Sequence, residues 1–215
     1  MTIDDAETAE LAGEILAAGD DARSIPPITA ERPDFSLDDA YRVSAEVVAR
    51  RVARGERRLG WKIGFTNRTI WDEYDVHAPI WGPIYDSTVV MVGEDLSATL
   101  DSAVVVEPRI EPEIAFRIAD APDPAGDERA LMGCIDGIAH GFEIVQSLFP
   151  GWRFAAADTA AAFALHGRYF LGPIVGITDG AEREAWLAGL ANFEMVLSRD
   201  GGEIDRGQGV NVLDG

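Results

Sequence analysis

The 215-residue chain has little positive charge and almost no lysine. It carries 18 Lys plus Arg against 38 Asp plus Glu, a formal net charge of -20, and Lys62 is its one lysine. Nucleic acids and anionic membranes are bound through basic faces, so the charge balance argues against both as partners. A single lysine in a chain that otherwise uses arginine is either a chance surface cation or a group whose site needs a compact ammonium.

Cysteine and long apolar runs are also scarce. Cys134 is the one cysteine, so no intrachain disulfide can form, which favours a reducing compartment. We expect Cys134 to be a small buried residue in a helix. The N-terminal residues MTIDDAETAE lack the basic and apolar parts of a signal peptide, and no apolar run approaches the ~18 residues that span a bilayer. We therefore expect a cytoplasmic protein.

Several common catalytic signatures are missing from the sequence. No His or Cys pair has zinc-ligand spacing, and the motifs GxGxxG, GxxxxGK and GxSxG do not occur. The chain is nevertheless 47% hydrophobic, enough for a folded core in one large domain or two small ones. Any chemistry must therefore come from a less common arrangement of residues.

The apolar pattern predicts helices in the first part of the chain. Residues 5–18 are rich in Ala, Glu and Leu, and the two prolines of SIPPIT end that helix. Ser36 is expected to begin a second helix, because Asp39 follows three residues later as in a capping box. Gly55 suits the end of that helix. We place the boundary of an N-terminal helical segment, residues 1–58, near Arg58.

Short apolar runs bounded by Gly, Pro and Asp then predict strands. The expected strands are GWKIGFT, PIYDSTVVMV, SAVVVEPRI, EPEIAFRI, GFEIVQS, HGRYFLGPIVGI and NFEMVLSRDGGEI, the last turning at Asp200-Gly201-Gly202. The segment DPAGDERALMGCIDGIAH is expected to be a loop that enters a helix. Helices followed by many short strands predict an α+β fold, with residues 59–215 as a β-rich domain.

Two glutamates flank a proline in the run RIEPEIAFRI. Glu111 and Glu113 are two residues apart, so in a strand they point to the same face. Pro112 cannot donate to a ladder and indicates an edge or a bulge. Paired carboxylates repel each other, and a hard cation such as Mg²⁺ or Ca²⁺ would remove the repulsion. The alternative is an exposed strand face on which both glutamates are solvated.

A third glutamate favours the cation site. Glu143 lies in the apolar run HGFEIVQSLF, where a charged group is usually paired or ligating. Together with Glu111 and Glu113 it could form one face of an octahedral site that leaves positions open for substrate and water. His140 could serve as a ligand or base, although a lone histidine at the end of a helix is more often structural.

These motifs, taken in order, resemble the 2-oxopent-4-enoate hydratase and 4-oxalocrotonate decarboxylase family of the fumarylacetoacetate hydrolase superfamily. The resemblance covers most of the chain from about residue 10. It is carried by these segments: SIPPIT, DDAY, GWKIGFTN, WGPIYDS, RIEPEIAF, FEIVQS, WRFAAADT and HGRYFLG. It implies a mixed β-roll or barrel behind the N-terminal helices.

The resemblance also implies a reaction. Such enzymes use Mg²⁺ or Mn²⁺ to act on a small 2-hydroxydienoic or 2-oxo acid of aromatic catabolism, and they form homodimers or larger homo-oligomers. The expected activity is hydration of a 2-hydroxy-2,4-dienoate to a 4-hydroxy-2-oxo acid through a metal-stabilised enolate. The implied metal ligands are Glu111, Glu113 and Glu143, and the implied catalytic groups are Lys62 and Asp86. Asp158 and His166 are further candidate catalytic groups.

Two departures from the family pattern keep other functions open. Ala162 and Phe163 stand where the family commonly has an Asp-Asn pair, and the chain stops at GVNVLDG, where we expect the family's C-terminal end to be missing. One alternative is a decarboxylase of a 2-oxo-3-enedioate or a C–C hydrolase on the same scaffold. The other is a non-catalytic partner subunit or small-acid binder.

Overall fold

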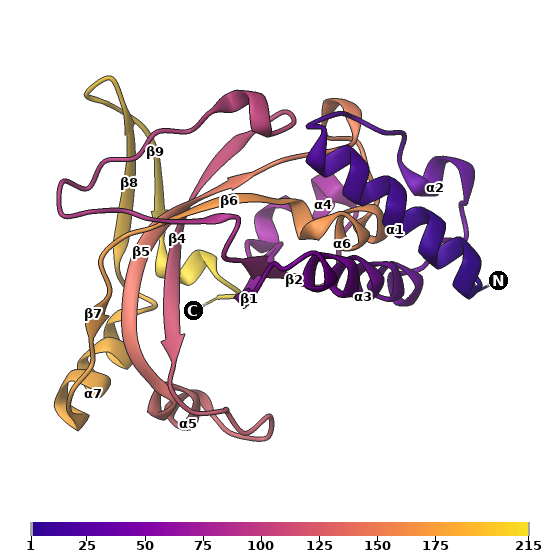
Figure 1. The fold of residues 1–215 in the computed structure, drawn as a ribbon. Helices are drawn as coiled ribbons and strands as arrows, with labels where there is room; N and C mark the ends of the chain where they lie inside the picture. Colours follow the sequence, from indigo (N-terminus) through magenta and orange to yellow (C-terminus); the bar gives the residue numbers. More distant parts are fainter. Residues whose placement is uncertain (1, 215) are drawn as a thin grey trace.

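The computed structural model describes residues 2–214 and has the N-terminal helices at one end and the long strands at the other (Figure 1). No helix within this range is long and apolar enough to cross a membrane. The α-helices are α1 Asp5–Asp20, α2 Ile28–Glu31, α3 Leu37–Ala53, α4 Trp71–Tyr74, α5 Glu128–Gly133, α6 Ala156–Ala161 and α7 Gly180–Gly189. Short 3-10 turns lie at Arg68–Ile70, Ser102–Val104, Pro150–Trp152, Phe163–Leu165 and Gly209–Asn211.

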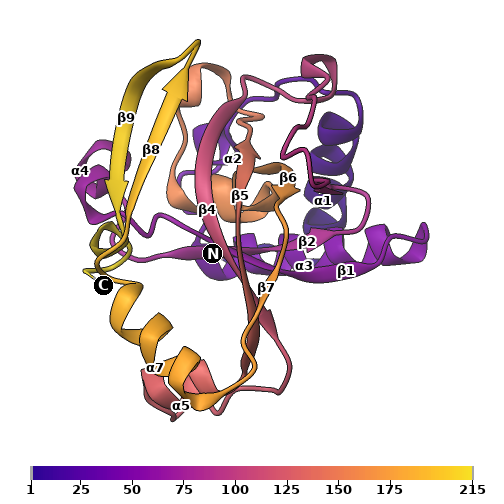
Figure 2. The ribbon, with the colours of Figure 1, turned by 90° about the vertical axis from the view of Figure 1, so that its left-hand side faces the viewer.

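The strands form three separate sheets. They are β1 Arg58–Gly64, β2 Ile80–Tyr85, β3 Val89–Met91, β4 Arg109–Ile118, β5 Ile135–Val145, β6 His166–Leu171, β7 Val175–Gly176, β8 Glu194–Arg199 and β9 Gly202–Gln208. β1 pairs with β2, and β8 pairs with β9. The main sheet has the order β3-β6-β5-β4, with β7 added to β5. The β8–β9 hairpin is a separate ribbon at one side of this sheet (Figure 2).

Capping fixes the starts of both long N-terminal helices. The Ser36 hydroxyl accepts the Asp39 N–H, and the Asp39 carboxylate accepts the Ser36 N–H, so α3 begins with the predicted capping box. Gly55 follows its last turn with φ +100°, a backbone region that favours glycine. Asp4 and Glu7 form a second capping box at α1. The predicted helices are therefore confirmed.

The main core joins the N-terminal helices to a later segment. Buried residues of α1 and α3 pack with α6 and the turn that follows it, including Ala161, Ala162 and Phe163. The apolar replacements at Ala162 and Phe163 are thus part of this core, at 2% and 8% exposure. β1 begins at Arg58, the predicted boundary. The division into two domains stays a prediction, because α6 comes from the second predicted domain but packs in the same core as α1 and α3.

The α+β class is confirmed, but several predicted elements are wrong in detail. SAVVVEPRI is not one strand: Ser102–Val104 is a 3-10 turn and β4 begins at Arg109. PIYDSTVVMV is broken into β2 and β3 by a turn. The helix expected around Cys134 is short, because α5 ends at Gly133 and β5 begins at Ile135. Cys134 lies between them and is half-buried, not a buried helix residue. In each case the pairing and packing of strands in the folded chain outweighed the local sequence pattern.

Candidate metal centre

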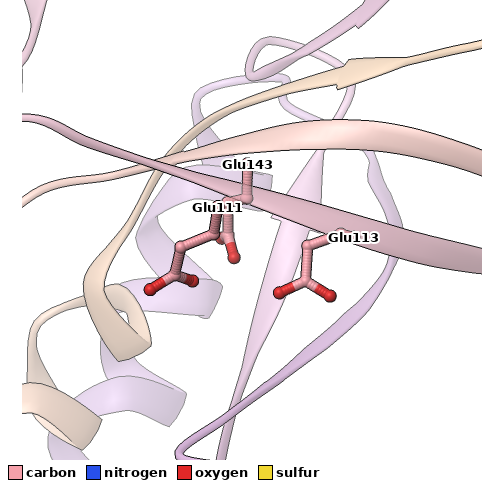
Figure 3. A group of neighbouring side chains, drawn as sticks. All are labelled: Glu111, Glu113 and Glu143. Carbon is pink, nitrogen blue, oxygen red and sulfur yellow. The ribbon is translucent and has the colours of Figure 1, made fainter. Parts of the chain in front are cut away.

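The three glutamates lie together on one face of β4 and β5. Glu111 and Glu113 alternate with Pro112 on β4, and the antiparallel register sets Glu111 directly opposite Glu143. Directly opposite residues project to the same face of a sheet. One oxygen atom from each of the three carboxylates lies within 4.8 Å of the others, and Figure 3 shows this convergence. β4 is the edge of its sheet, as Pro112 predicted.

Glu143 is the most firmly held of the three. It is 2% exposed, and its two oxygen atoms have different partners: Lys62 Nζ at 3.0 Å and His166 Nδ1 at 2.7 Å. Burial alone would raise the pKa of Glu143, but the charge of Lys62 and the contact with His166 outweigh it, so the pKa lies below its usual range. Glu143 is therefore ionised at neutral pH.

Glu111 and Glu113 have no such partners. Within residues 2–214, no group donates a hydrogen bond to either carboxylate. Burial, followed by the charges of Glu143 and Glu111, raises the pKa of Glu113 to about 7. Glu111 is exposed, but partial loss of hydration raises its pKa too, against the opposing charge of Lys62. Carboxylates this close and this poor in donors need a counter-charge, and oxygen-only donors are what Mg²⁺ and Ca²⁺ prefer. The residues present therefore fit a hard divalent cation.

Lys62 reaches this centre from a different sheet. It lies on β1, and its side chain is 10% exposed. Burial acts to lower the pKa of Lys62, yet the charges of Glu143, Glu111 and Glu113 raise it above the usual value. The lone lysine is therefore a charged ammonium beside the carboxylates, not a chance surface cation.

His166 holds the Glu143 carboxylate in position through a hydrogen bond. The ring is 3% exposed, and burial lowers its pKa despite the neighbouring carboxylate. An ionised carboxylate can only accept, so Nδ1 carries the proton and donates to Glu143. Nε2 lies 2.9 Å from the Thr88 hydroxyl oxygen, which donates to the Tyr85 carbonyl. The turn before His166 has positive φ at Phe163, Ala164 and Leu165. Backbone strain of this kind persists only where packing holds it, here in the core.

The structure does not bring Asp86 and Asp158 to the carboxylates. Asp86 follows β2 and accepts the Arg57 N–H at 3.0 Å, whereas Lys62 pairs with Gly82 further along the same strands. Asp158 is fully buried at the start of α6. It accepts hydrogen bonds from the Thr29 N–H at 2.9 Å and hydroxyl at 2.6 Å, and from the Ala155 N–H at 2.8 Å. Their catalytic roles stay predictions.

Two neighbours of the centre were missed by the sequence reasoning. Tyr169 lies on β6 opposite Glu143, and Thr88 holds the ring of His166. The alternation of HGRYFLG could have placed Tyr169 on one face of a strand, but which strand lies beside it depends on the sheet order. His140, the other histidine weighed as a ligand, is exposed and pairs in register with Ile114.

Known proteins resemble this chain in sequence and in fold. It is 34% identical over 193 residues to a 2-hydroxyhexa-2,4-dienoate hydratase of Comamonas testosteroni, covering 89% of this chain and 69% of that protein. It is 32% identical to a 2-hydroxypent-2,4-dienoate hydratase of Pseudomonas putida, covering 76% and 72%. It is 28% identical to a 4-oxalocrotonate decarboxylase of Pseudomonas sp. (strain CF600), covering 94% and 73%. No family model matches the chain.

A solved 4-oxalocrotonate decarboxylase from Pseudomonas putida G7, complexed with magnesium and adipate, superposes with a TM-score of 0.87. It covers 99% of this chain and 77% of that one, at 24% identity. The fold is thus that of an α+β protein of this kind, and the hydratase relatives make it an enzyme of the lyase class. The chain belongs to the family of 2-hydroxydienoate hydratases and 4-oxalocrotonate decarboxylases.

Proposed function

We propose that the protein hydrates a 2-hydroxy-2,4-dienoate to a 4-hydroxy-2-oxo acid with the help of a divalent cation. The observation that carries the proposal is the convergence of Glu111, Glu113 and Glu143 within 4.8 Å, with Lys62 against one of them. The two relatives above 30% identity are both named as hydratases of 2-hydroxydienoates. A small substrate with a carboxylate next to an oxygenated carbon suits a centre of this charge.

The three glutamates would hold Mg²⁺ or Mn²⁺. A bound divalent cation supplies a Lewis acid that stabilises negative charge developing on the substrate's 2-oxygen. Magnesium and calcium are both named as ligands of solved 4-oxalocrotonate decarboxylases with this fold. Because Glu111 and Glu113 lack donors within residues 2–214, their lone pairs are free for a cation.

The remaining residues hold and position charge. His166 fixes one oxygen of Glu143, so that the other stays directed toward Lys62. The Lys62 ammonium would neutralise the substrate carboxylate or relay a proton during ketonisation of the dienol. Water addition at C4 then needs one further proton transfer, to C3. Asp86, Asp158 and His166 remain proposed contributors to acid-base transfer.

The biological setting follows from the substrate class. We place the enzyme in the breakdown of aromatic or related compounds, in the cytoplasm, within the fumarylacetoacetate hydrolase superfamily. A homodimer or larger homo-oligomer is supported by the edge strand β4, whose face opposite the carboxylates exposes Ile110, Phe116 and Ile118 at 42–47%.

Decarboxylation of a 2-oxo-3-enedioate is the second candidate. Arg109 lies two residues before Glu111 on β4, so the two share a face of the strand. Its guanidinium stacks 4.0 Å from the Trp152 ring, donates to the Tyr74 hydroxyl at 3.1 Å, and forms no ion pair within residues 2–214. A second substrate carboxylate could therefore bind Arg109, which a monocarboxylic dienoate would leave unused.

A spectroscopic assay separates these functions. Purified protein with Mg²⁺ should consume the ultraviolet absorbance of a 2-hydroxypentadienoate, and EDTA should abolish the turnover. Turnover that persists unchanged in EDTA would contradict the metal role. Release of CO₂ from a 2-oxo-hexenedioate would instead support the decarboxylase, and binding of Mg²⁺ and a 2-oxo acid without turnover would support a non-catalytic binder.

A further inference from the structure

We propose that the hydroxyl group of Tyr169 is a further substrate-binding group of this centre, which donates a hydrogen bond to an oxygen atom of the bound 2-oxo acid. The proposal rests on the proposed function, because it assigns the small acid to the space between the glutamates. Tyr169 lies in the segment HGRYFLG but was not among the residues predicted for the site. The hydroxyl would add a neutral hydrogen-bond donor to a site whose other proposed donor to the substrate, Lys62, is charged.

The position of Tyr169 follows from the sheet register. Tyr169 on β6 is directly opposite Glu143 on β5, and Glu143 is directly opposite Glu111 on β4. The three side chains therefore form one row across the same face of the sheet. Burial, followed by the charges of Glu113 and Glu143, raises the pKa of Tyr169. The phenol stays protonated and can donate.

Gly141 lets the tyrosyl ring reach the centre. Gly141 is the register partner of Glu113, one step along β5 from Glu143 on the same face. A Cβ atom at Gly141 would stand 3.0 Å from the Tyr169 hydroxyl oxygen and 3.1 Å from its Cζ, and 2.3 Å from the Phe170 carbonyl oxygen. The ring thus lies over the glycine, so the hydroxyl is between β6 and the Glu113 position.

The Tyr169 hydroxyl has no hydrogen-bond partner among residues 2–214. Tyr169 is 8% exposed, and among residues 2–214 the hydroxyl groups of Tyr169 and Tyr85 are the buried side-chain polar atoms without a hydrogen-bond partner. Leaving a buried donor unpaired is unfavourable, because the group loses its hydrogen bonds to water without a replacement. A donor held beside carboxylates that themselves lack donors is best explained by a ligand oxygen that enters the same space.

Tyr85 offers a matched control. Its hydroxyl is equally buried and unpaired, at 1% exposure, but its ring lies under the Arg51 guanidinium at 4.0 Å, and its charged neighbours are Arg51 and Glu56 rather than the three glutamates. A Phe substitution removes the same atom from the same kind of environment in both cases. The two variants differ only in whether the hydroxyl faces the carboxylates.

The test compares Tyr169→Phe and Tyr85→Phe by calorimetry. Each protein is titrated with Mg²⁺ and then, at saturating Mg²⁺, with oxalate as a planar 2-oxo acid mimic. Loss of one hydrogen bond to the acid should weaken oxalate binding to Tyr169→Phe by about three- to tenfold. Its Mg²⁺ affinity should change less than about twofold, its apo melting temperature should not fall, and Tyr85→Phe should bind both ligands like the wild type.

Each other outcome counts against the proposal. Unchanged oxalate affinity in Tyr169→Phe would overturn it. A parallel loss of Mg²⁺ affinity would show that the hydroxyl acts through Glu113 instead of on the acid, and absence of oxalate binding by the Mg²⁺-loaded wild type would also overturn it. Failure of the proposed function is distinguishable, because it would appear as intact oxalate binding without turnover of any dienoate.

Discussion

Lys62 Nζ lies 3.0 Å from Glu143 Oε2 and joins two sheets that share no strand. Lys62 belongs to the β1–β2 pair and Glu143 to the centre of the main sheet. Both side chains are nearly buried, at 10% and 3% exposure. A buried pair costs desolvation, so its presence is weak evidence for stability and stronger evidence for a site that needs both charges.

Replacing Lys62 by arginine should impair turnover although the charge is kept. The planar guanidinium is larger than the ammonium and cannot occupy the same space between β1 and Glu143. We expect kcat/KM on a 2-hydroxydienoate to fall at least about tenfold. The exchange Arg129→Lys, at a side chain that is 63% exposed and pairs with Glu184, is the control for a conservative cationic swap. Wild-type rates in Lys62→Arg would demote Lys62 to a structural residue.

Glu113→Gln should lose metal affinity while the chain stays folded. An amide is isosteric with the carboxylate but supplies no charge, so Mg²⁺ binding by calorimetry should weaken on the order of tenfold or more. The apo variant should melt no lower than the wild type at pH 8. The pKa of Glu113 is raised to about 7 by burial and by its neighbours, so its ionised form opposes folding at that pH.

The exposed strand residue Glu203 provides the comparison for Glu113. Glu203→Gln removes one negative charge from β9, away from the centre, and should leave Mg²⁺ binding as it is in the wild type. If Glu113→Gln bound Mg²⁺ at full strength, Glu113 would not be a ligand.

Asp158→Ala should lower stability rather than metal affinity. The carboxylate accepts hydrogen bonds from Thr29 and Ala155, which tie α2 to the start of α6 in the core. Losing a buried cap of this kind costs about 1–3 kcal/mol, measurable as a shift of the urea midpoint. Mg²⁺ affinity should stay within about twofold of the wild type. A selective loss of turnover with unchanged stability would instead support the catalytic assignment of Asp158.

Much of the carboxylate site could be predicted because its signal is local. Glu111 and Glu113 share a strand, so the two-residue period alone places them on one face. Glu143 stood out as a charged residue in an apolar run, but its pairing opposite Glu111 depends on the order of strands. The role of Lys62 was predicted from composition and family resemblance. Residue spacing could not predict it, because Lys62 and Glu143 lie in different sheets.

Two of the predicted catalytic residues have hydrogen-bond partners outside the carboxylate centre, and their roles stay predictions. Asp86 accepts a backbone N–H of Arg57, and Asp158 accepts the Ala155 N–H and the Thr29 hydroxyl. Short Asp side chains compete readily for nearby N–H groups, and a sequence motif does not show which choice is made. Tyr169 was not predicted, because its place in the site depends on its lying opposite Glu143 on the neighbouring strand, which the sequence does not show.

Glu56 should make stability depend on pH below about 5. Its side chain is 11% exposed, accepts from Arg51 Nη2 at 2.6 Å and Nε at 3.0 Å, and also contacts Arg54 and Ser87. Burial acts to raise the pKa of Glu56, but these hydrogen bonds lower it to about 2. A depressed carboxyl pKa stabilises the fold above the unfolded value of about 4.5, and this contribution is lost as the pH falls toward 2.

The variant Glu56→Gln should therefore be less stable than the wild type at pH 7 by about 1–2 kcal/mol, allowing for solvent screening. The gap should narrow steadily as the pH falls below 4.5, because the protonated carboxyl of the wild type and the amide of the variant are both neutral. Urea unfolding at pH 7, 5, 4 and 3.5 measures the gap. Glu46→Gln, in a half-exposed pair with Arg50, removes a carboxylate without this network and should cost less than about 0.5 kcal/mol. A gap for Glu56→Gln that is the same at every pH would refute the assignment.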